Sequence, residues 1–300
     1  MGVTAAAAVG SALALDLAFE EFPGRVHPVA LFGRVVGRFD RSWSRPRAVG
    51  AGVALVLPLA AAAVAAALTA LSLRTHAVLG GGVAALALFS TTSLRMLHVA
   101  ARDVIQRSDG DADAARRAVR ALVGRDAAAL SPGELRSAAV ESAAENLADG
   151  LVAPLFAFAL GAQVSLSAAV AAAVWVKAVN TLDSMLGYRS KPVGWASARL
   201  DDLVMWVPAR LAAVLIAAAA RSPGALSRAG AWSHAPPSPN SGWPMATLAA
   251  AIDAELLKPG VYDLNPDAAL PDTDRATAGV RLVSVAGLLA FALAGVVAWC

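Results

Sequence analysis

The sequence predicts an all-α, multi-pass integral membrane protein, and three observations lead to this fold class. Of its 300 residues, 58% are hydrophobic and 16% are charged, whereas a soluble protein carries about 25% charged residues. Four stretches lack charged side chains altogether, namely residues 48–73, 77–94, 150–176 and 282–300. Each is close to or above the roughly 20 apolar residues that a membrane-spanning helix needs. Arginines gather beside these stretches, as they do in membrane proteins.

Two further apolar stretches extend the pattern. Residues 1–15 are apolar, and the first basic residue is Arg25, so we interpret them as a retained first helix rather than a signal peptide. Residues 203–220 carry one charge, Arg210. Buried helices of a large soluble protein are the alternative, but the number of apolar stretches favours a membrane. Because the polar segments are short, we expect a single membrane-embedded domain over residues 1–300.

The net charge and the cysteine content exclude several kinds of function and site. A formal charge of +3 would suggest nucleic-acid binding in a soluble domain, but here the arginines flank apolar stretches, so we expect no nucleic-acid partner. Six of them lie between the first two long apolar stretches: Arg25, Arg34, Arg38, Arg41, Arg45 and Arg47. The positive-inside rule places this loop in the cytoplasm. The single cysteine, Cys300, excludes an intrachain disulfide and a cysteine-based metal site.

A helix with a well-defined start carries the first group of candidate site residues. Ser131, Pro132 and Glu134 match an N-cap, a proline at the first helical position and a capping-box glutamate. Gly150 and Pro154 predict the end of this helix. Between these limits the sequence "ESAAENLADGLVAPL" (141–155) passes directly from acids and amides into an apolar stretch.

Three acids in that helix are spaced four residues apart, which places Glu141, Glu145 and Asp149 on one face. They repel one another, and the helix dipole disfavours a negative charge near the C-terminus. A bound cation would compensate both effects, and oxygen ligands without thiols favour Mg²⁺. The alternative is a solvated acidic face, but the adjoining apolar stretch favours a functional site.

A second polar group lies at the end of a charge-free stretch. In "WVKAVNTLDSMLGY" (175–188) the polar side chains are Lys177, Asn180, Thr181, Asp183 and Ser184. On a helix, four of them fall within an arc of about 100°, and Asp183 lies beside it. Lys177 could instead extend to the membrane surface with Asp183 as an exposed neighbour. The additional amide and hydroxyls favour a site.

A third group follows a turn marked by Gly187 and Gly194, which carries Arg189 and Lys191. Ser197 can cap the next helix, whose first turns hold Arg199, Asp201 and Asp202. Acids at a helix start are stabilised by the dipole alone, yet acids beside basic groups also suit a nucleotide phosphate and its metal.

The fourth group lies in "SHAPPSPNSGWP" (233–244), which contains Ser238 and Asn240. Its prolines predict an extended loop, followed by a short helix near 246–257. No Walker-type loop, Gly-x-Ser-x-Gly or His-Glu-x-x-His motif is present. The residues alone therefore indicate a membrane enzyme or transporter with a carboxylate-rich site for metal and phosphate.

Four segments together resemble the CobD/CbiB family of cobalamin-biosynthesis proteins, the adenosylcobinamide-phosphate synthases. They are "HPVALFG" (27–33), "VGRD" leading into "AAVESAAENLADGLVAPLFAFALG" (123–161), "KAVNTLDSMLGY" with "GWASARLDDLVMWVPARL" (177–211), and "SPNSGWPMA" (238–246). The resemblance implies an integral membrane enzyme that uses ATP to join adenosylcobyric acid to (R)-1-aminopropan-2-ol phosphate. Some relatives use the unphosphorylated aminoalcohol or ethanolamine derivatives.

The resemblance also gives the polar groups expected roles. ATP would convert a carboxylate into an acyl phosphate before the amine attacks, by analogy with other amide ligases, and phosphoryl transfer requires Mg²⁺. We expect metal ligands at Glu141, Glu145 and Asp149, and a second acidic group at Asp201 and Asp202. Phosphate binding is expected at Lys177, Lys191 and Arg199. Corrin amides or phosphates would contact Asn146, Asn180 and Asn240, and the remaining substrate-binding residues would be Thr181, Asp183, Ser184 and Ser238. All four segments should line one pocket near the cytoplasmic membrane surface.

The chain departs from the family pattern at two motifs. It has "FEEFP" (19–23) where the family has Gly-Asp-Pro or Gly-Glu-Pro, and His234 stands two places before the usual histidine, so a catalytic role for His234 is not expected. A transporter of a phosphorylated or corrinoid substrate is the alternative function, although no repeat symmetry is found. A hairpin within 150–180, or a non-spanning 203–220, would bring the polar loops to one face. A homo-oligomer is compatible with the sequence.

Overall fold

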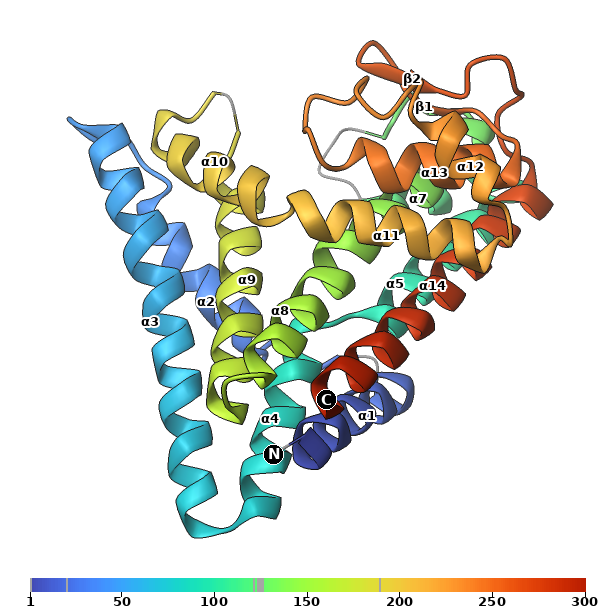
Figure 1. Ribbon diagram of the computed structural model, residues 1–300. Coiled ribbons are helices and arrows are strands. Elements are labelled where there is room, and N and C mark those ends of the chain that lie inside the picture. Colours follow the sequence, from blue (N-terminus) through green and yellow to red (C-terminus); the bar gives the residue numbers. More distant parts are fainter. Residues whose placement is uncertain (1, 20, 121, 123–126, 189) are drawn as a thin grey trace. The chain divides into compact units, whose positions relative to one another are not determined.

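A computed structural model describes residues 2–19, 21–120, 122, 127–188 and 190–300. The expected positions Arg189 and "VGRD" (123–126) lie outside these described residues. The chain forms two compact units: Met1–Ser93, Asp149–Met205 and Phe291–Cys300 make unit 1, and Leu94–Ala148 and Trp206–Ala290 make unit 2. Each unit is helical (Figure 1). The predicted all-α class is confirmed.

Within the described residues, six helices are long and apolar enough to cross a membrane. Their ranges are Gly2–Phe19, Pro46–Thr75, Ala77–Ser108, Pro132–Ala162, Leu166–Leu186 and Thr273–Trp299. A seventh span results if Pro192–Val204 and Trp206–Ala219, which meet at a bend of 47°, count as one. The protein is therefore a multi-pass helical membrane protein, as predicted.

Unit 1 consists of helices that follow the predicted apolar stretches. Its elements are α1 (Gly2–Phe19), α2 (Pro28–Val36), η1 (Gly37–Phe39), α3 (Pro46–Thr75), α4 (Ala77–Thr91), η2 (Ala148–Val152), α8 (Ala153–Ala162), α9 (Leu166–Leu186), η3 (Pro192–Gly194) and α10 (Trp195–Val204). Helices α3 and α4 form a hairpin around His76, whose ring accepts a hydrogen bond from the Val78 amide. Helix α9 packs against both α3 and α8. It is therefore the central helix of this unit.

Helices α8 and α9 form a tight hairpin, so the charge-free stretch 150–176 is not one span. Ser165 caps α9 by accepting from the Ala168 amide. A Cβ at Gly161 would lie 2.6 Å from the Ala168 carbonyl oxygen, so the close approach of the two helices requires glycine there. This is one of the two arrangements expected to bring the polar loops to one face.

The helix that begins at Ser131 has the predicted start but not the predicted end. Ser131 and Glu134 form the capping box reciprocally. The predicted stop at Gly150 is wrong, because α7 (Pro132–Leu147) continues through a π-helical turn, η2, into α8. Pro154 is tolerated because it directly follows the π turn, where the helical hydrogen-bond pattern is already altered.

Unit 2 combines helices with a small hairpin of strands that the sequence analysis did not predict. Its elements are α5 (Leu94–Ser108), α6 (Ala112–Val119), α7, α11 (Trp206–Ala219), α12 (Pro223–Ala229), α13 (Gly242–Ile252), β1 (Leu256–Lys258), β2 (Tyr262–Leu264) and most of α14 (Thr273–Trp299). The strands are antiparallel, with Leu256 opposite Leu264 and Lys258 opposite Tyr262. Gly260 has φ +72° in the connecting turn, a conformation that favours glycine.

The proline-rich segment 233–244 was predicted to be an extended loop. Residues 233–241 are non-helical, as predicted, but they form turns and bends, and residues 242–244 belong to α13. The following helix spans Gly242–Ile252 rather than 246–257. It begins earlier because a proline within the first helical turn, Pro244, is compatible with the helix. It ends earlier because Asp253 adopts a left-handed conformation with φ 50°.

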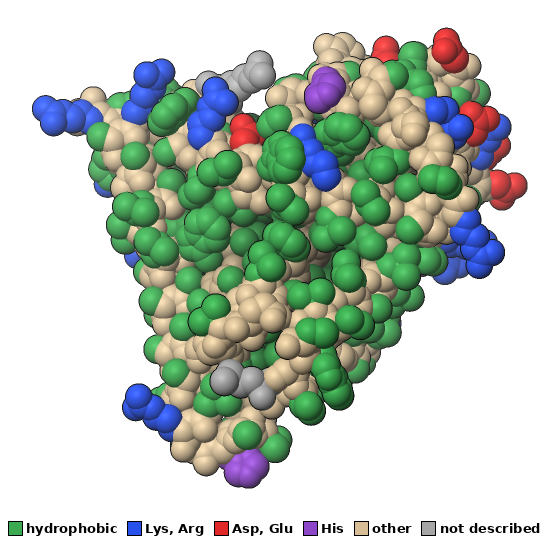
Figure 2. Space-filling model, viewed as in Figure 1, with side chains coloured by type: hydrophobic (Ala, Val, Ile, Leu, Met, Phe, Trp, Pro, Cys, Tyr) green, Lys and Arg blue, Asp and Glu red, His purple; other side chains and the backbone are tan. Residues whose placement is uncertain are grey.

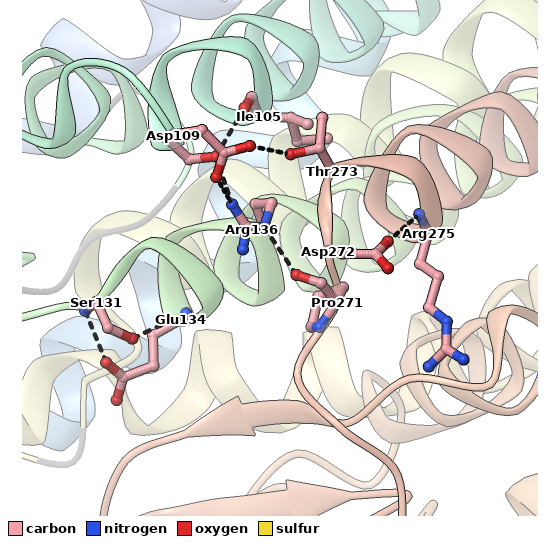
Figure 3. Close-up of polar contacts among 10 residues, drawn as sticks. Ile105, Asp109, Ser131, Glu134, Arg136, Pro271, Asp272, Thr273 and Arg275 are labelled. Carbon is pink, nitrogen blue, oxygen red and sulfur yellow. Dashed lines mark hydrogen bonds and ion pairs between the residues drawn. The ribbon is translucent and has the colours of Figure 1, made fainter.

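One arginine joins three segments of unit 2 (Figure 3). Arg136 on α7 donates to the Pro271 carbonyl at 2.7 Å and to the Ser108 hydroxyl at 3.0 Å, and it pairs with the Asp109 carboxylate. Asp109 also accepts from the Thr273 hydroxyl at 2.5 Å. This hydrogen bond is the main reason that the pKa of Asp109 lies below its ordinary value, and Arg136 lowers it further.

We predict that Arg136→Ala lowers the free energy of unfolding by about 1–3 kcal/mol, because a carbonyl and a hydroxyl in the interior lose their donor. Thermal unfolding in detergent measures the change. Arg107→Ala is the matched control, since Arg107 pairs with the exposed Asp103 and should change stability by less than about 0.5 kcal/mol. Equal losses in both variants would contradict the assignment.

The same cluster predicts that the stability of the protein decreases at acidic pH. Since the folded pKa of Asp109 is depressed, its contribution is complete above the unfolded pKa and disappears as the pH falls through the folded pKa. The fall in stability below about pH 4 should therefore be smaller in Asp109→Asn than in the unchanged protein.

Candidate functional site

A lysine in the middle of a membrane-spanning helix is the centre of a charged cluster in unit 1. Lys177 on α9 interacts electrostatically with Asp149 and Glu21. The Asn180 side chain, one turn later, donates to the Asp149 carboxylate at 3.5 Å. Asp149 lies in the π turn η2. Ionisable groups inside a membrane span are costly unless paired and usually mark a functional site, so this cluster is the first candidate.

The connection between α1 and α2 supplies members of this cluster that sequence reasoning missed. His27 caps α2 by accepting from the Val29 amide at 3.2 Å, and its ring meets Phe22 edge-on. Burial lowers the pKa of His27, and the positive charge of Lys177 lowers it further, so the imidazole is neutral at pH 7. Glu21 lies in "FEEFP", a motif that the sequence analysis treated only as a departure from the family.

Paired acids form a second group in unit 1, where α9 meets α10. The Asp183 carboxylate on α9 interacts with Asp202 on α10, and Asp202 interacts with Arg199. Asp183 also lies against the chain at Gly187, where a Cβ would come within 1.8 Å of its Oδ1. Two carboxylates and one cation from two helices suit a metal–phosphate group, since Mg²⁺ commonly takes one or two carboxylates together with substrate phosphates.

Other predicted residues of unit 1 donate hydrogen bonds to groups of the same unit. The Lys191 ammonium donates to Asp40 at 2.7 Å and to the Met185 carbonyl at 3.3 Å. Thr181 and Ser184 donate their hydroxyls to carbonyls of their own helix, at 2.8 and 3.0 Å. These hydroxyls retain acceptor capacity, but their donor bonds are used.

In unit 2, the carboxylate of Glu141 is buried and held by two hydrogen bonds from other side chains. Glu141 is 4% exposed and accepts from the Ser137 hydroxyl at 2.9 Å and from the Tyr262 hydroxyl at 2.5 Å. Ser137 in turn accepts from the Leu257 amide at 2.7 Å. Glu141 thereby ties α7 to the β1–β2 hairpin. Tyr262 was missed because nothing in the sequence links it to an acid 121 residues away.

The positions and hydrogen bonds of the predicted acids decide which of them can bind a metal ion. No group of three His, Cys, Asp or Glu side chains within the described part of the chain is close enough to hold a metal ion. Both carboxylate oxygens of Glu141 already accept hydroxyl hydrogens, so Glu141 suits a positioning role better than metal ligation. Asp183 and Asp202 fit Mg²⁺ better. Glu145 is partly exposed on α7, and its metal role remains a prediction.

Amides and an arginine form the remaining group of unit 2. Arg210 on α11 donates to the Asn240 side-chain oxygen at 2.6 Å and to the Pro239 carbonyl at 3.0 Å. Its guanidinium lies 4.7 Å from the centre of the Trp206 ring. Ser238 accepts from the Asn240 amide at 3.2 Å, so the proline-rich loop is built around Arg210. The other predicted amide, Asn146, donates to its own helix at Ser142.

The structure therefore brings the predicted residues together in separate groups. Unit 1 unites Asp149, Lys177 and Asn180, and separately Asp183, Arg199 and Asp202. Unit 2 holds Glu141, Glu145, Asn146, Ser238 and Asn240. A single pocket lined by all four segments would join both units and remains a prediction.

Comparison with known proteins identifies the family. The family model described as CobD/Cbib protein matches residues 9–290, nearly the whole chain. The chain belongs to the CobD/CbiB family. All four sequence segments that resembled the family lie within the matched range.

Individual relatives have similar length. The chain is 34% identical over 293 residues to the probable cobalamin biosynthesis protein CobD of Methanothrix thermoacetophila, covering 93% of this chain and 92% of that protein. It is 38% identical to the cobalamin biosynthesis protein CobD of Geobacter metallireducens (86% and 83% covered) and 39% identical to that of Mycobacterium tuberculosis (83% and 79%). No solved structure matches the chain.

We predict that Tyr262→Phe destabilises the protein by about 1.5–3 kcal/mol, the usual contribution of a hydrogen bond to a charged group, because the buried Glu141 carboxylate loses a donor. Tyr188→Phe is the matched control, as Tyr188 is 52% exposed. Thermal unfolding of both variants checks the prediction. A Tyr262→Phe variant as stable as the control would show that the contact contributes nothing.

Proposed function

We propose that this protein acts in cobalamin biosynthesis as an ATP-dependent amide synthase. Its substrates would be adenosylcobyric acid and (R)-1-aminopropan-2-ol phosphate or a related aminoalcohol, and its product adenosylcobinamide phosphate. The observation that carries the proposal is the family match over residues 9–290. Relatives that carry the name cobalamin biosynthesis protein CobD support the pathway.

The reaction has two balanced steps. A carboxylate oxygen of the corrinoid attacks the γ-phosphorus of ATP, which gives an acyl phosphate and releases ADP. The amine nitrogen then attacks the acyl carbon, the C–N bond forms, and inorganic phosphate leaves. The amine must lose a proton in this step, and we assign its binding and deprotonation to the carboxylate of Asp149.

The charged groups of unit 1 suit the first step. Asp183 and Asp202 would hold Mg²⁺, which neutralises charge on the transferring phosphoryl group when it is bound. Arg199, beside Asp202, would bind phosphate oxygens, together with Lys177 and Lys191.

A transporter of corrinoid or phosphorylated substrates is the second candidate. The bend of 47° between Pro192–Val204 and Trp206–Ala219 favours it, because broken helices form substrate sites in transporters. Purified protein in nanodiscs separates the two functions. The synthase requires adenosylcobyric acid, ATP and the aminoalcohol together to form corrinoid amide and ADP in equal amounts, whereas a transporter moves corrinoid across vesicles and leaves it unchanged.

We predict that Asp202→Asn lowers turnover by roughly 100-fold and raises the Mg²⁺ concentration needed for half-maximal rate, as loss of a metal ligand does. Glu145→Gln should also lower turnover while the protein still inserts into the membrane. Asp113→Asn is the control, since its side chain is 78% exposed. Near-normal turnover with unchanged Mg²⁺ dependence in either site variant would remove that residue from the assignment.

The site should face the cytoplasm, and we place the protein in the cell membrane with residues 25–47 on the cytoplasmic side. In a Cys300→Ser background, Arg41→Cys should react with a membrane-impermeant maleimide only in inside-out vesicles. Labelling confined to intact cells would reverse the orientation.

A further inference from the structure

Unit 1 contains a cavity of about 550 Å³, and Lys177 and Thr181 are the predicted site residues that line it. Helices α2, α3, α4 and α9 enclose it, and its wall is almost entirely apolar. Along α3 it is lined from Leu57 to Leu68. Its volume lies within the range of about 300–1,000 Å³ that is typical of ligand pockets.

The few hydroxyls on the wall already have partners. Ser90 donates to the Ala87 carbonyl at 2.7 Å, and Thr91 donates to the Leu88 carbonyl at 2.8 Å. Thr181 on α9 donates within its own helix in the same way. A buried water needs two to four polar partners, so water fills this cavity poorly. An apolar occupant leaves the donor bonds of these hydroxyls intact, and Lys177 is the charged side chain on the wall.

The cavity opens towards the hydrocarbon of the membrane. Val64, Leu68 and Leu86 line it and are also exposed on the surface of the unit. Helices α3, α4 and α9 all belong to candidate membrane spans. Figure 2 shows the flank formed by α3 covered mainly by hydrophobic and uncharged side chains. The molecules that reach the opening are therefore lipid tails.

The length of the cavity indicates which kind of apolar molecule fits it. The lining of α3 extends over eleven residue steps from Leu57 to Leu68, about 16 Å at 1.5 Å per residue, which equals half of the roughly 30 Å hydrocarbon core. The lining therefore has the length of an alkyl chain that spans one leaflet of the bilayer.

We propose that one acyl chain of a bilayer phospholipid occupies this cavity as a bound lipid. The chain completes the packing between α3, α4 and α9, because an unfilled space of this size would forfeit dispersion contacts along its whole wall. It also covers the cavity-facing side of Lys177, which lines one part of the wall. The inference is independent of the reaction that the protein catalyses.

The test uses the full chain in nanodiscs of phosphatidylcholine that carries a photoactivatable diazirine within one acyl chain. After irradiation, peptide mass spectrometry locates the attached lipid. Cross-links should concentrate on the cavity-lining residues of 57–68 on α3 and on the facing residues of α4 and α9. Labelling spread evenly over all lipid-facing helices would show ordinary surrounding lipid and overturn the proposal.

Variants give a second, independent readout. Ala61→Phe and Ala65→Phe place a ring in the cavity, whereas Ala63→Phe and Ala67→Phe place the same ring on exposed positions of α3 outside the lining. The first pair should reduce cavity cross-linking about tenfold, the factor expected when roughly two methylene contacts are lost. The second pair should leave it unchanged. Equal cross-linking in both pairs, in protein with an unchanged unfolding midpoint, contradicts the proposal.

Discussion

The structure depends on the requirement that a charge inside an apolar span must be compensated. Lys177 lies in the middle of α9, and Asp149 and Glu21 compensate it from two other segments. An unpaired ammonium in hydrocarbon costs several kcal/mol at least. This pairing therefore determines which side of α9 faces the π turn η2 and how closely the connection from α1 to α2 approaches. The neutral His27 beside it follows from the same constraint.

Unit 2 satisfies the same requirement with hydrogen bonds. The buried Glu141 carboxylate accepts two hydroxyl hydrogens, and the Arg210 guanidinium binds an amide oxygen and a backbone carbonyl. Both groups join segments that lie far apart in the sequence. A charged group with fixed partners keeps its orientation when substrate binds, which is the kind of support that precise catalytic groups need.

The sequence predicted the helical class, most spans and the N-cap at Ser131, because apolar length and capping are local properties. It could not predict that Glu21 approaches Lys177, since that contact joins segments far apart in the chain. The β1–β2 hairpin was not predicted because strands of three residues are too short to show a recognisable alternation of polar and apolar side chains. The spacing of four that placed Asp149 on the stripe of Glu141 and Glu145 assumed a regular α-helix, which ends at Leu147.

The π turn at Ala148–Val152 has a consequence for how this helix tolerates changes of length. A π turn accommodates one residue more than the α-helical path it replaces. Removal of one residue there would leave a continuous α-helix that is still long enough to cross the bilayer. Because the turn already absorbs that residue, the side chains after the deletion would keep nearly the same facing, whereas the same deletion within α7 would rotate every later side chain by about 100° around the axis. The π turn is thus the point of this helix where one residue can be lost without turning α8 away from α9.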